Sequence, residues 1–215
     1  NSTATATQMS KEAAEAGADG ILLVTPYYNK ATQNGLIKHY TTITDEAKVP
    51  AILYNVPSRT GCSLAASTVA YLAKNAEYVT AIKEASGDIS HVADIMYACD
   101  GAIDLYSGND DQIVPILSLG GKGVISVLSN VAPKETHDIV ALFLEGKIKE
   151  SRELQLKALP LVHALFSEVN PIPVKAALNL MGKEVGPLRL PLTEMEAAHQ
   201  EVLAEEMKKF GIKLA

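Results

Sequence analysis

The chain has 215 residues, of which 47% are hydrophobic, and it carries a formal net charge of -6 with a pI near 5.4. This composition is typical of a globular protein with a sizeable core, and it excludes disordered and fibrous proteins. The acidic balance and the scattered basic residues argue against a nucleic-acid surface, so small molecules and other subunits are the expected partners. No apolar run approaches the roughly 18 residues of a membrane span. Cys62 and Cys99 lack metal-ligand spacing and indicate reduced thiols in a cytoplasmic protein.

The first 130 residues alternate between helical and extended patterns. Helices are indicated by apolar residues at helical spacing, and strands by short apolar runs bounded by proline, glycine or asparagine. The expected helices cover residues 1–19, 34–47, 63–74, 89–99 and 113–119, and the expected strands cover 21–25, 51–54, 79–86, 103–106 and 124–127. After residue 130 the pattern is helical to the end, with breaks at Pro133, Pro160, Pro171 and Pro173 and a long final helix over residues 194–210.

The alternation predicts an α/β fold with a parallel sheet that is buried on both faces. Polar residues fall at or near the C-terminal ends of the five strands: Tyr28, Tyr54, Lys83, Asn109 and Ser126. Convergence of successive strand ends favours the mouth of a (β/α)8 TIM barrel over an open doubly wound sheet. An open sheet usually carries a glycine-rich dinucleotide motif after a strand, whereas the glycines at 120–123 precede one.

A closed barrel needs eight strands, and the sequence predicts five. These five units take about 127 residues, so a complete barrel at the same spacing would need a chain of about 290 residues. We therefore expect this chain to supply strands 4 to 8 and the C-terminal helices, with an N-terminal portion absent. The expected division is residues 1–130 for the barrel units and 131–215 for the last barrel helix and a helical extension.

Lys83 lies in an apolar strand, where a charged amine is hardest to keep. Burial lowers the pKa of a lysine by up to about 3 to 5 units, and a neutral lysine attacks carbonyl groups. The alternative is a lysine whose stem is buried while its amine reaches water or Glu84. Tyr54 ends the preceding strand, so its phenol is expected to share the barrel interior with the amine and to relay a proton during imine formation. Arg59 has the fork geometry that holds a carboxylate, and together these residues describe a site for a keto acid.

Five motifs along the whole chain resemble the pyruvate-dependent class I aldolase family. They are Thr-Pro-Tyr-Tyr-Asn at 25–29, Tyr-Asn-Val-Pro-Ser-Arg-Thr-Gly at 54–61, Ile-Lys-Glu-Ala-Ser at 82–86, Gly-Gly-Lys-Gly-Val-Ile-Ser-Val at 120–127 and Asn-Pro-Ile-Pro-Val-Lys at 170–175. The run Ser-Arg-Thr at 58–60 is similar to the dihydrodipicolinate synthase group of this family. N-acetylneuraminate lyases and 2-keto-3-deoxy sugar-acid aldolases share the tyrosine and the lysine and remain alternatives, as does a non-catalytic ligand-binding or assembly fragment.

The resemblance implies a cytoplasmic homotetramer, built as a dimer of dimers, that condenses pyruvate with L-aspartate 4-semialdehyde in lysine and diaminopimelate biosynthesis. The product is 4-hydroxy-tetrahydrodipicolinate, and no cofactor is implied because Lys83 itself forms an imine with pyruvate. Tyr54 would relay protons, and Tyr28 would reach across a dimer interface into a neighbour's site. Arg59 would hold the semialdehyde carboxylate, and the backbone at Gly108 and Ile125 would shape the pocket.

Two departures from the family pattern limit these expectations. The Gly-Thr-Thr-Gly-Glu motif, whose threonine joins the two tyrosines in the family's proton relay, does not occur in this sequence. We therefore expect the chain to be inactive alone. Asn1 and Tyr27 match positions that line the allosteric lysine cleft of sensitive members, but Thr5 stands where those members have an acidic residue. We expect weak or no inhibition by lysine.

The remaining titratable residues point to structural roles. Five histidines share no ligand spacing and lie mostly in predicted helices, so we expect no metal site: His39, His91, His137, His163 and His199. The adjacent carboxylates Asp110 and Asp111 could form an acidic dyad, but they lie where a helix N-terminus favours negative charge. A capping role is the favoured interpretation.

Overall fold

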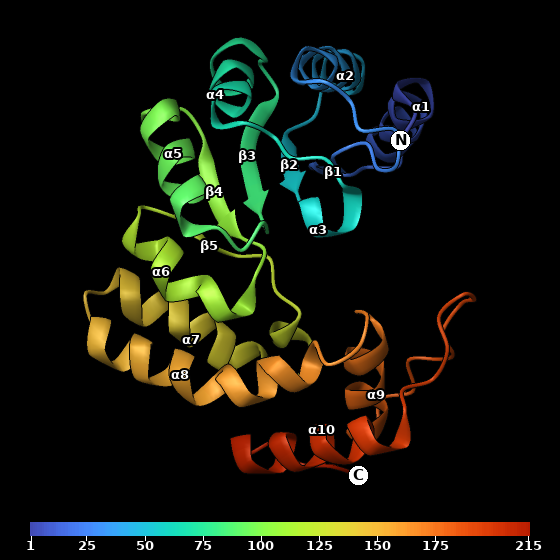
Figure 1. The fold of residues 1–215 in the computed structure, drawn as a ribbon, viewed down its shortest axis with the longest axis vertical. Coiled ribbons are helices and arrows are strands. Elements are labelled where there is room, and N and C mark those ends of the chain that lie inside the picture. The colour runs from blue at the N-terminus through green and yellow to red at the C-terminus, as the bar shows by residue number, and fades with distance from the viewer. The chain divides into compact units, whose positions relative to one another are not determined.

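The computed structural model describes all 215 residues. The chain forms two compact units, the first made of Asn1–Asn109 with Pro115–Ile125 and the second of Asp110–Val114 with Ser126–Ala215 (Figure 1). None of the helices combines the length and the apolar character that a membrane span requires.

The first unit is built on a parallel five-stranded sheet whose strands are neighbours in chain order (Figure 1). The strands are β1 (Ile21–Val24), β2 (Ala51–Asn55), β3 (Val79–Glu84), β4 (Asp104–Ser107) and β5 (Gly123–Val124). The helices of this unit are α1 (Thr3–Glu15), α2 (Gln33–Ala47), α3 (Pro57–Thr60), α4 (Ala66–Asn75) and α5 (Ile89–Cys99). Residues of both units form helix α6 (Ile113–Ser118), and the 3-10 turn before it, η1 (Asp110–Gln112), belongs to the second unit. The predicted alternation of helices and parallel strands is confirmed.

One face of the sheet is covered by helices. Helices α1, α2, α4 and α5 pack in a row, each against the next, so that their apolar stripes meet the strands. The largest fully buried side chains in this layer include Leu36 and Tyr40 of α2, Leu53 of β2 and Ile82 of β3. This layer fixes the positions of the strand ends that carry the candidate site.

The opposite face of the sheet is only partly buried, which corrects the prediction that both faces would be buried. On β1, Leu22 and Val24 are 44% and 37% exposed, and Thr80 and Asp104 are exposed on β3 and β4. No element of the first unit packs over this face, so side chains alternate between covered and open positions with the two-residue period of a strand. A hollow on this face is lined by Pro50, Ile52, Thr80, Asp104, Tyr106 and Val124.

The second unit is helical. It contains α7 (Pro133–Leu144), α8 (Ile148–Leu165), α9 (Ile172–Leu180), α10 (Ala197–Phe210) and the 3-10 turn η2 (Leu128–Asn130). Helix α8 packs against α7, α9 and α10 around a core that includes Leu161, Leu165 and Leu203.

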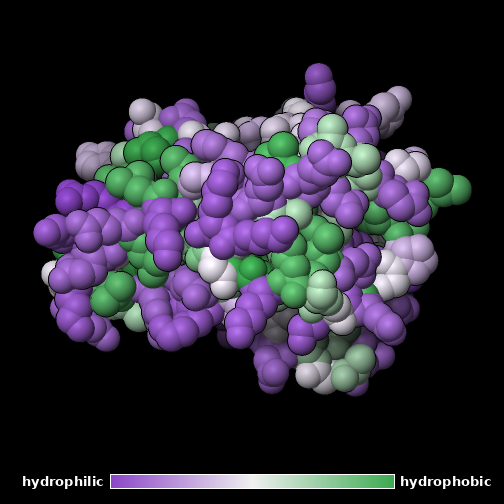
Figure 2. Space-filling view, turned by 90° about the horizontal axis from the view of Figure 1, so that it is seen from below, coloured by the Kyte–Doolittle hydropathy of each residue, from purple (hydrophilic) through white to green (hydrophobic).

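Figure 2, which views the molecule from below the orientation of Figure 1, shows a mostly hydrophilic surface with smaller apolar patches between the polar groups.

Several predicted details of the elements were wrong, and most of the other boundaries differ by a few residues. The last strand ends at Val124 instead of residue 127, and the turn η2 follows soon after it. The stretch after β2 contains a short helix, α3, that was expected to be loop. Pro160 lies inside α8; because Pro160 and Leu156 are both exposed, water can solvate the carbonyl that loses its partner. Residues 183–196 are not helical, because Gly182 and Gly186 adopt positive φ and Pro187 and Pro191 cannot donate hydrogen bonds.

Candidate functional site

Lys83 and Tyr54 are direct partners in the pairing of β2 with β3. Their side chains leave the same face of the sheet, and Lys83 Nζ lies 4.3 Å from the centroid of the Tyr54 ring. Both residues are half-buried. The structure therefore brings together the amine and the phenol that the sequence placed on adjacent strands.

Glu84 is not the partner of Lys83, because neighbouring residues of a strand point to opposite faces. Its side chain is fully buried on the helix-covered face, behind the sheet as seen from Lys83. The pleat of β3 thus places the Glu84 carboxylate and the Lys83 side chain on opposite faces of the sheet.

The surroundings of Tyr54 favour its protonated form. Burial raises the pKa of the Tyr54 phenol, and the positive charge of Arg59 acts in the opposite direction and lowers that pKa. Burial is the larger effect, so the phenol remains a proton donor at neutral pH.

Arg59 is positioned by helix α3, which follows β2 almost directly. Pro57 occupies the start of α3, and Gly61 ends it in the left-handed conformation with φ 66°. Arg59 thus lies in the single helical turn that follows the strand of Tyr54, and its side chain is exposed. The sequence did contain a signal for α3, since proline at the first helical position and glycine just after the last are common helix boundaries.

Gly108 lies directly after β4 and closes against β3. Its N–H donates to the carbonyl of Glu84 at 2.7 Å. A Cβ at this position would lie 2.6 Å from Ala85 Cβ and 3.2 Å from Lys83 Cε. A side chain at position 108 would clash with Ala85 and crowd the stem of Lys83. Ile125 continues the same edge, because its N–H donates to the carbonyl of Ser107 at 2.8 Å.

Tyr28 has an unusual backbone conformation. Its φ is 73°, a left-handed value that strains a bulky residue, and its side chain is 89% exposed. The Tyr28 N–H donates to the carbonyl of Thr60 at 3.4 Å, which places its backbone at the end of α3. Tyr27 is 50% exposed. Asn1 contributes its carbonyl to a hydrogen bond from Asn29 Nδ2 at 3.4 Å.

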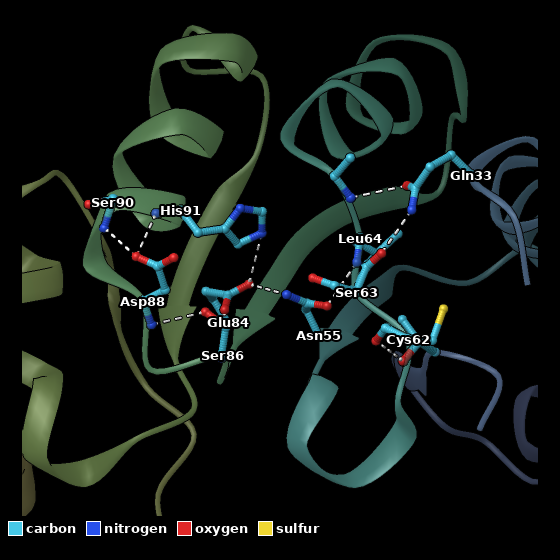
Figure 3. Close-up of polar contacts among 12 residues, drawn as sticks. Gln33, Asn55, Cys62, Ser63, Leu64, Glu84, Ser86, Asp88, Ser90 and His91 are labelled. Atoms are coloured by element: carbon cyan, nitrogen blue, oxygen red, sulfur yellow. Dashed lines mark hydrogen bonds and ion pairs between the residues drawn. The ribbon is translucent and has the colours of Figure 1, made fainter. Parts of the chain in front are cut away.

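A buried polar network behind the strands was missed by the sequence analysis. Glu84 Oε2 accepts from Asn55 Nδ2 at 2.8 Å, and Glu84 Oε1 accepts from the N–H of Ser86 at 2.7 Å (Figure 3). Asn55 Oδ1 accepts from the N–H of Leu64 at 3.0 Å. The signal was the strand alternation itself, which places the residue after each candidate site residue on the buried face.

The residues assigned structural roles in the sequence can also be located. Asp110 does act as a cap, but for the turn η2 instead of the helix that follows it in sequence. Its Oδ2 accepts from the N–H groups of Val127 at 3.0 Å and Leu128 at 2.8 Å. Burial raises the pKa of Asp110, opposed by its hydrogen bonds. Ser126 lies just beyond β5, where its Oγ accepts from the N–H of Ser129. All five histidines lie in helices, as predicted.

Comparison with known proteins gives one consistent family. The profile of the dihydrodipicolinate synthetase family matches residues 1–210. The chain is 62% identical to 4-hydroxy-tetrahydrodipicolinate synthase of Lachnoclostridium phytofermentans, over 99% of this chain and 72% of the relative. It is 58% identical to the protein of the same name from Caldicellulosiruptor bescii, over 99% and 71%.

Solved structures of similar proteins share the fold. The dihydrodipicolinate synthase of Thermotoga maritima superposes with a TM-score of 0.96 at 44% identity, covering 98% of this chain and 72% of that chain. The structure from Cyanidioschyzon merolae, solved with lysine bound, gives a TM-score of 0.96 at 41% identity and covers 99% and 72%.

Proposed function

Because the chain belongs to the dihydrodipicolinate synthetase family, we propose that it condenses pyruvate with L-aspartate 4-semialdehyde through an imine on Lys83. The product is 4-hydroxy-tetrahydrodipicolinate, and the reaction belongs to lysine and diaminopimelate biosynthesis. The observation that carries the proposal is the Lys83 amine lying 4.3 Å from the Tyr54 ring centroid at the ends of adjacent parallel strands. Imine chemistry uses the lysine itself, so the reaction requires no cofactor.

In this proposal the Lys83 amine attacks the C2 carbonyl of pyruvate. The resulting carbinolamine loses water to give the imine, and the hydroxyl that leaves must receive a proton. Tyr54 is suited to donate that proton because burial raises the pKa of its phenol and keeps it protonated. Arg59 binds the carboxylate of the semialdehyde, since its guanidinium presents two parallel donors.

Backbone groups and a second subunit complete the proposed site. Gly108 and Ile125 shape the pyruvate pocket, which the close approach of Gly108 to the Lys83 stem supports. Tyr28 extends into the site of a neighbouring protomer, and its 89% exposure and strained backbone support a role outside its own protomer. The proposed assembly is a homotetramer made of two dimers.

The proposed full architecture is a (β/α)8 barrel. The five strands are assigned to barrel strands 4 to 8, residues 1–130 to the barrel units and 131–215 to the last barrel helix and the helical extension. The match in fold to longer solved relatives supports this assignment. Cys62 and Cys99 are buried and form no disulfide, which favours the cytoplasm as the location of the protein.

Borohydride trapping with pyruvate tests the imine. Borohydride reduces an imine to a stable secondary amine, so intact mass should increase by one reduced pyruvate, and peptide mapping should place it on Lys83. Lys83→Ala should abolish the adduct. Lys122→Ala, at an exposed lysine of the same unit, should retain it. A wild-type chain that gains no mass would instead favour the non-catalytic ligand-binding alternative.

A second proposal concerns regulation by lysine at Asn1 and Tyr27. A related structure contains bound lysine, but Thr5 supplies no negative charge for the ammonium group. We expect weak binding by calorimetric titration, and Thr5→Glu should tighten it about tenfold because a charge-assisted bond is added. Ala4→Glu, exposed on the same helix, is the matched control and should not change the affinity. Low-micromolar binding by the wild-type chain would contradict this expectation.

A further inference from the structure

Strands β2 and β3 carry two residue pairs in the same register. Tyr54 faces Lys83 on the open face, and the next residues, Asn55 and Glu84, are also Cα partners but lie on the helix-covered face. Asn55 and Glu84 are both fully buried, and Asn55 Nδ2 donates to Glu84 Oε2 at 2.8 Å (Figure 3). The back of the proposed site is therefore joined by a side-chain hydrogen bond.

The geometry of this pair is fixed by further bonds at both ends. Glu84 Oε1 accepts from the N–H of Ser86 at 2.7 Å, and His91 Nε2 lies 3.9 Å from Glu84 Oε2. Asn55 Oδ1 accepts from the N–H of Leu64 at 3.0 Å. A buried carboxylate is costly unless its oxygens are hydrogen-bonded, so small displacements of either strand end are penalised.

We infer that Asn55 and Glu84 are positioning residues that set the distance between the Tyr54 phenol and the Lys83 amine. The inference rests on the proposed function of those two residues. A slip of one residue between the strands would move Asn55 or Glu84 to the open face and leave buried partners unpaired. The Asn55–Glu84 hydrogen bond therefore favours the strand register that places Tyr54 opposite Lys83. It acts on catalysis through geometry and touches no reacting atom.

An isosteric exchange of donor and acceptor tests this inference. Asn55→Asp removes the donor and brings two carboxylates together. Glu84→Gln replaces one acceptor oxygen by an N–H group, so two donors face each other, either at Asn55 Nδ2 or at the Ser86 N–H. In the double variant Asn55→Asp/Glu84→Gln, the amide introduced on β3 can donate to the carboxylate introduced on β2, while the N–H groups of Ser86 and Leu64 keep their acceptors. All three hydrogen bonds are restored, and only the one between positions 55 and 84 has its donor and acceptor exchanged.

The readout is the rate of borohydride trapping with saturating pyruvate at mildly alkaline pH, alongside circular dichroism and the thermal midpoint. Each single variant should be trapped about tenfold more slowly or worse, because small misplacements of reacting groups are costly. The double variant should recover to within about threefold of wild type. If a single variant does not fold, the double variant decides alone: a wild-type rate supports the inference, and a folded but slow double variant overturns it.

Gln33→Leu is the matched structural control. Gln33 Nε2 donates to the Ser63 carbonyl at 2.9 Å and Gln33 Oε1 accepts from the Ala65 N–H at 3.0 Å, so it anchors the segment around Leu64 without contacting Glu84. It should lower the thermal midpoint and leave the trapping rate unchanged. An equally slow Gln33→Leu would overturn the inference, as would folded single variants trapped at the wild-type rate. A wild-type chain that is not trapped at all would refute the proposed function instead.

Discussion

The side chain of Tyr54 is under two opposing electrostatic influences. Burial raises the pKa of its phenol because the phenolate loses solvation, and the Arg59 guanidinium lowers that pKa because it attracts the phenolate. The same arginine that is proposed to bind the substrate carboxylate therefore also adjusts the proposed proton donor. A substrate carboxylate that neutralises Arg59 would make Tyr54 a weaker acid.

Replacing Arg59 tests this coupling. In Arg59→Gln the lowering influence is lost, so the pKa of Tyr54 should rise further and the phenol should ionise only at higher pH. Spectrophotometric titration measures it, with Tyr54→Phe variants identifying which part of the tyrosine signal belongs to Tyr54. Arg152→Gln, at an exposed arginine of α8, should leave the Tyr54 titration unchanged. A Tyr54 pKa that stays constant or falls in Arg59→Gln would contradict the coupling.

At the residue scale, the pair on the open face was predicted from the sequence and the pair on the buried face was missed. Lys83 and Tyr54 could be paired because each ends an apolar strand, and the structure brings them together. The Asn55–Glu84 bond depends on strand register, which no local pattern specifies. The strained backbone of Tyr28 likewise arises from its loop surroundings and has no signature in the sequence.

Strands β3 and β4 approach closely where Gly108 meets the stem of Lys83. Gly108→Ala would place a methyl group 2.6 Å from Ala85 Cβ and 3.2 Å from Lys83 Cε, so the backbone or the lysine must move. We expect a loss of about 1 to 3 kcal/mol in the free energy of unfolding. Trapping with pyruvate should slow about tenfold or more because the amine is displaced.

Urea denaturation and trapping kinetics measure these two effects. Gly35→Ala is the control, because Gly35 lies in the first turn of α2, where a methyl group would be 3.3 Å from the nearest atom, Thr32 Oγ1. Alanine favours a helix over glycine, but the added methyl group crowds the Thr32 side chain, so the two effects should largely cancel in stability, and the trapping rate should be unchanged. A Gly108→Ala chain with wild-type stability and rate would show that the contact is easily relieved.

Most elements could be predicted because their apolar periodicity is strong. Helix α5 was placed correctly at both ends, since its apolar residues recur at helical spacing and Asp88 caps it. The weak strand β5 was predicted too long because its end is set by the turn that Asp110 caps, a contact distant in sequence. Residues 183–196 were wrongly predicted to be helical, because the glycine and proline residues at 182–191 break the helix there.

The whole chain is expected to form the imine faster than it completes the condensation. The family resemblance places a threonine between the two relay tyrosines, within a Gly-Thr-Thr-Gly-Glu motif that this sequence does not contain. Loss of positioned proton transfer typically costs about 100-fold or more in rate. We therefore expect turnover at least that much slower than in the Lachnoclostridium phytofermentans relative, with pyruvate trapping retained.

Steady-state assays of both proteins with pyruvate and aspartate semialdehyde measure the difference. The Lys83→Ala variant, purified in the same way and assayed alone, controls for activity from contaminating enzyme. Equal turnover by the chain and the relative would mean that the Gly-Thr-Thr-Gly-Glu motif is not needed.

The strand order described above leaves β1 at an edge of the sheet, which has a practical consequence for handling the protein. Strand β1 pairs only with β2, so one row of its backbone donors and acceptors is open, and Leu22 and Val24 lie beside that row. Such a border can recruit an extended segment from another molecule. We therefore expect the chain to self-associate more as its concentration rises, so the concentration reached during purification should determine how much of it aggregates.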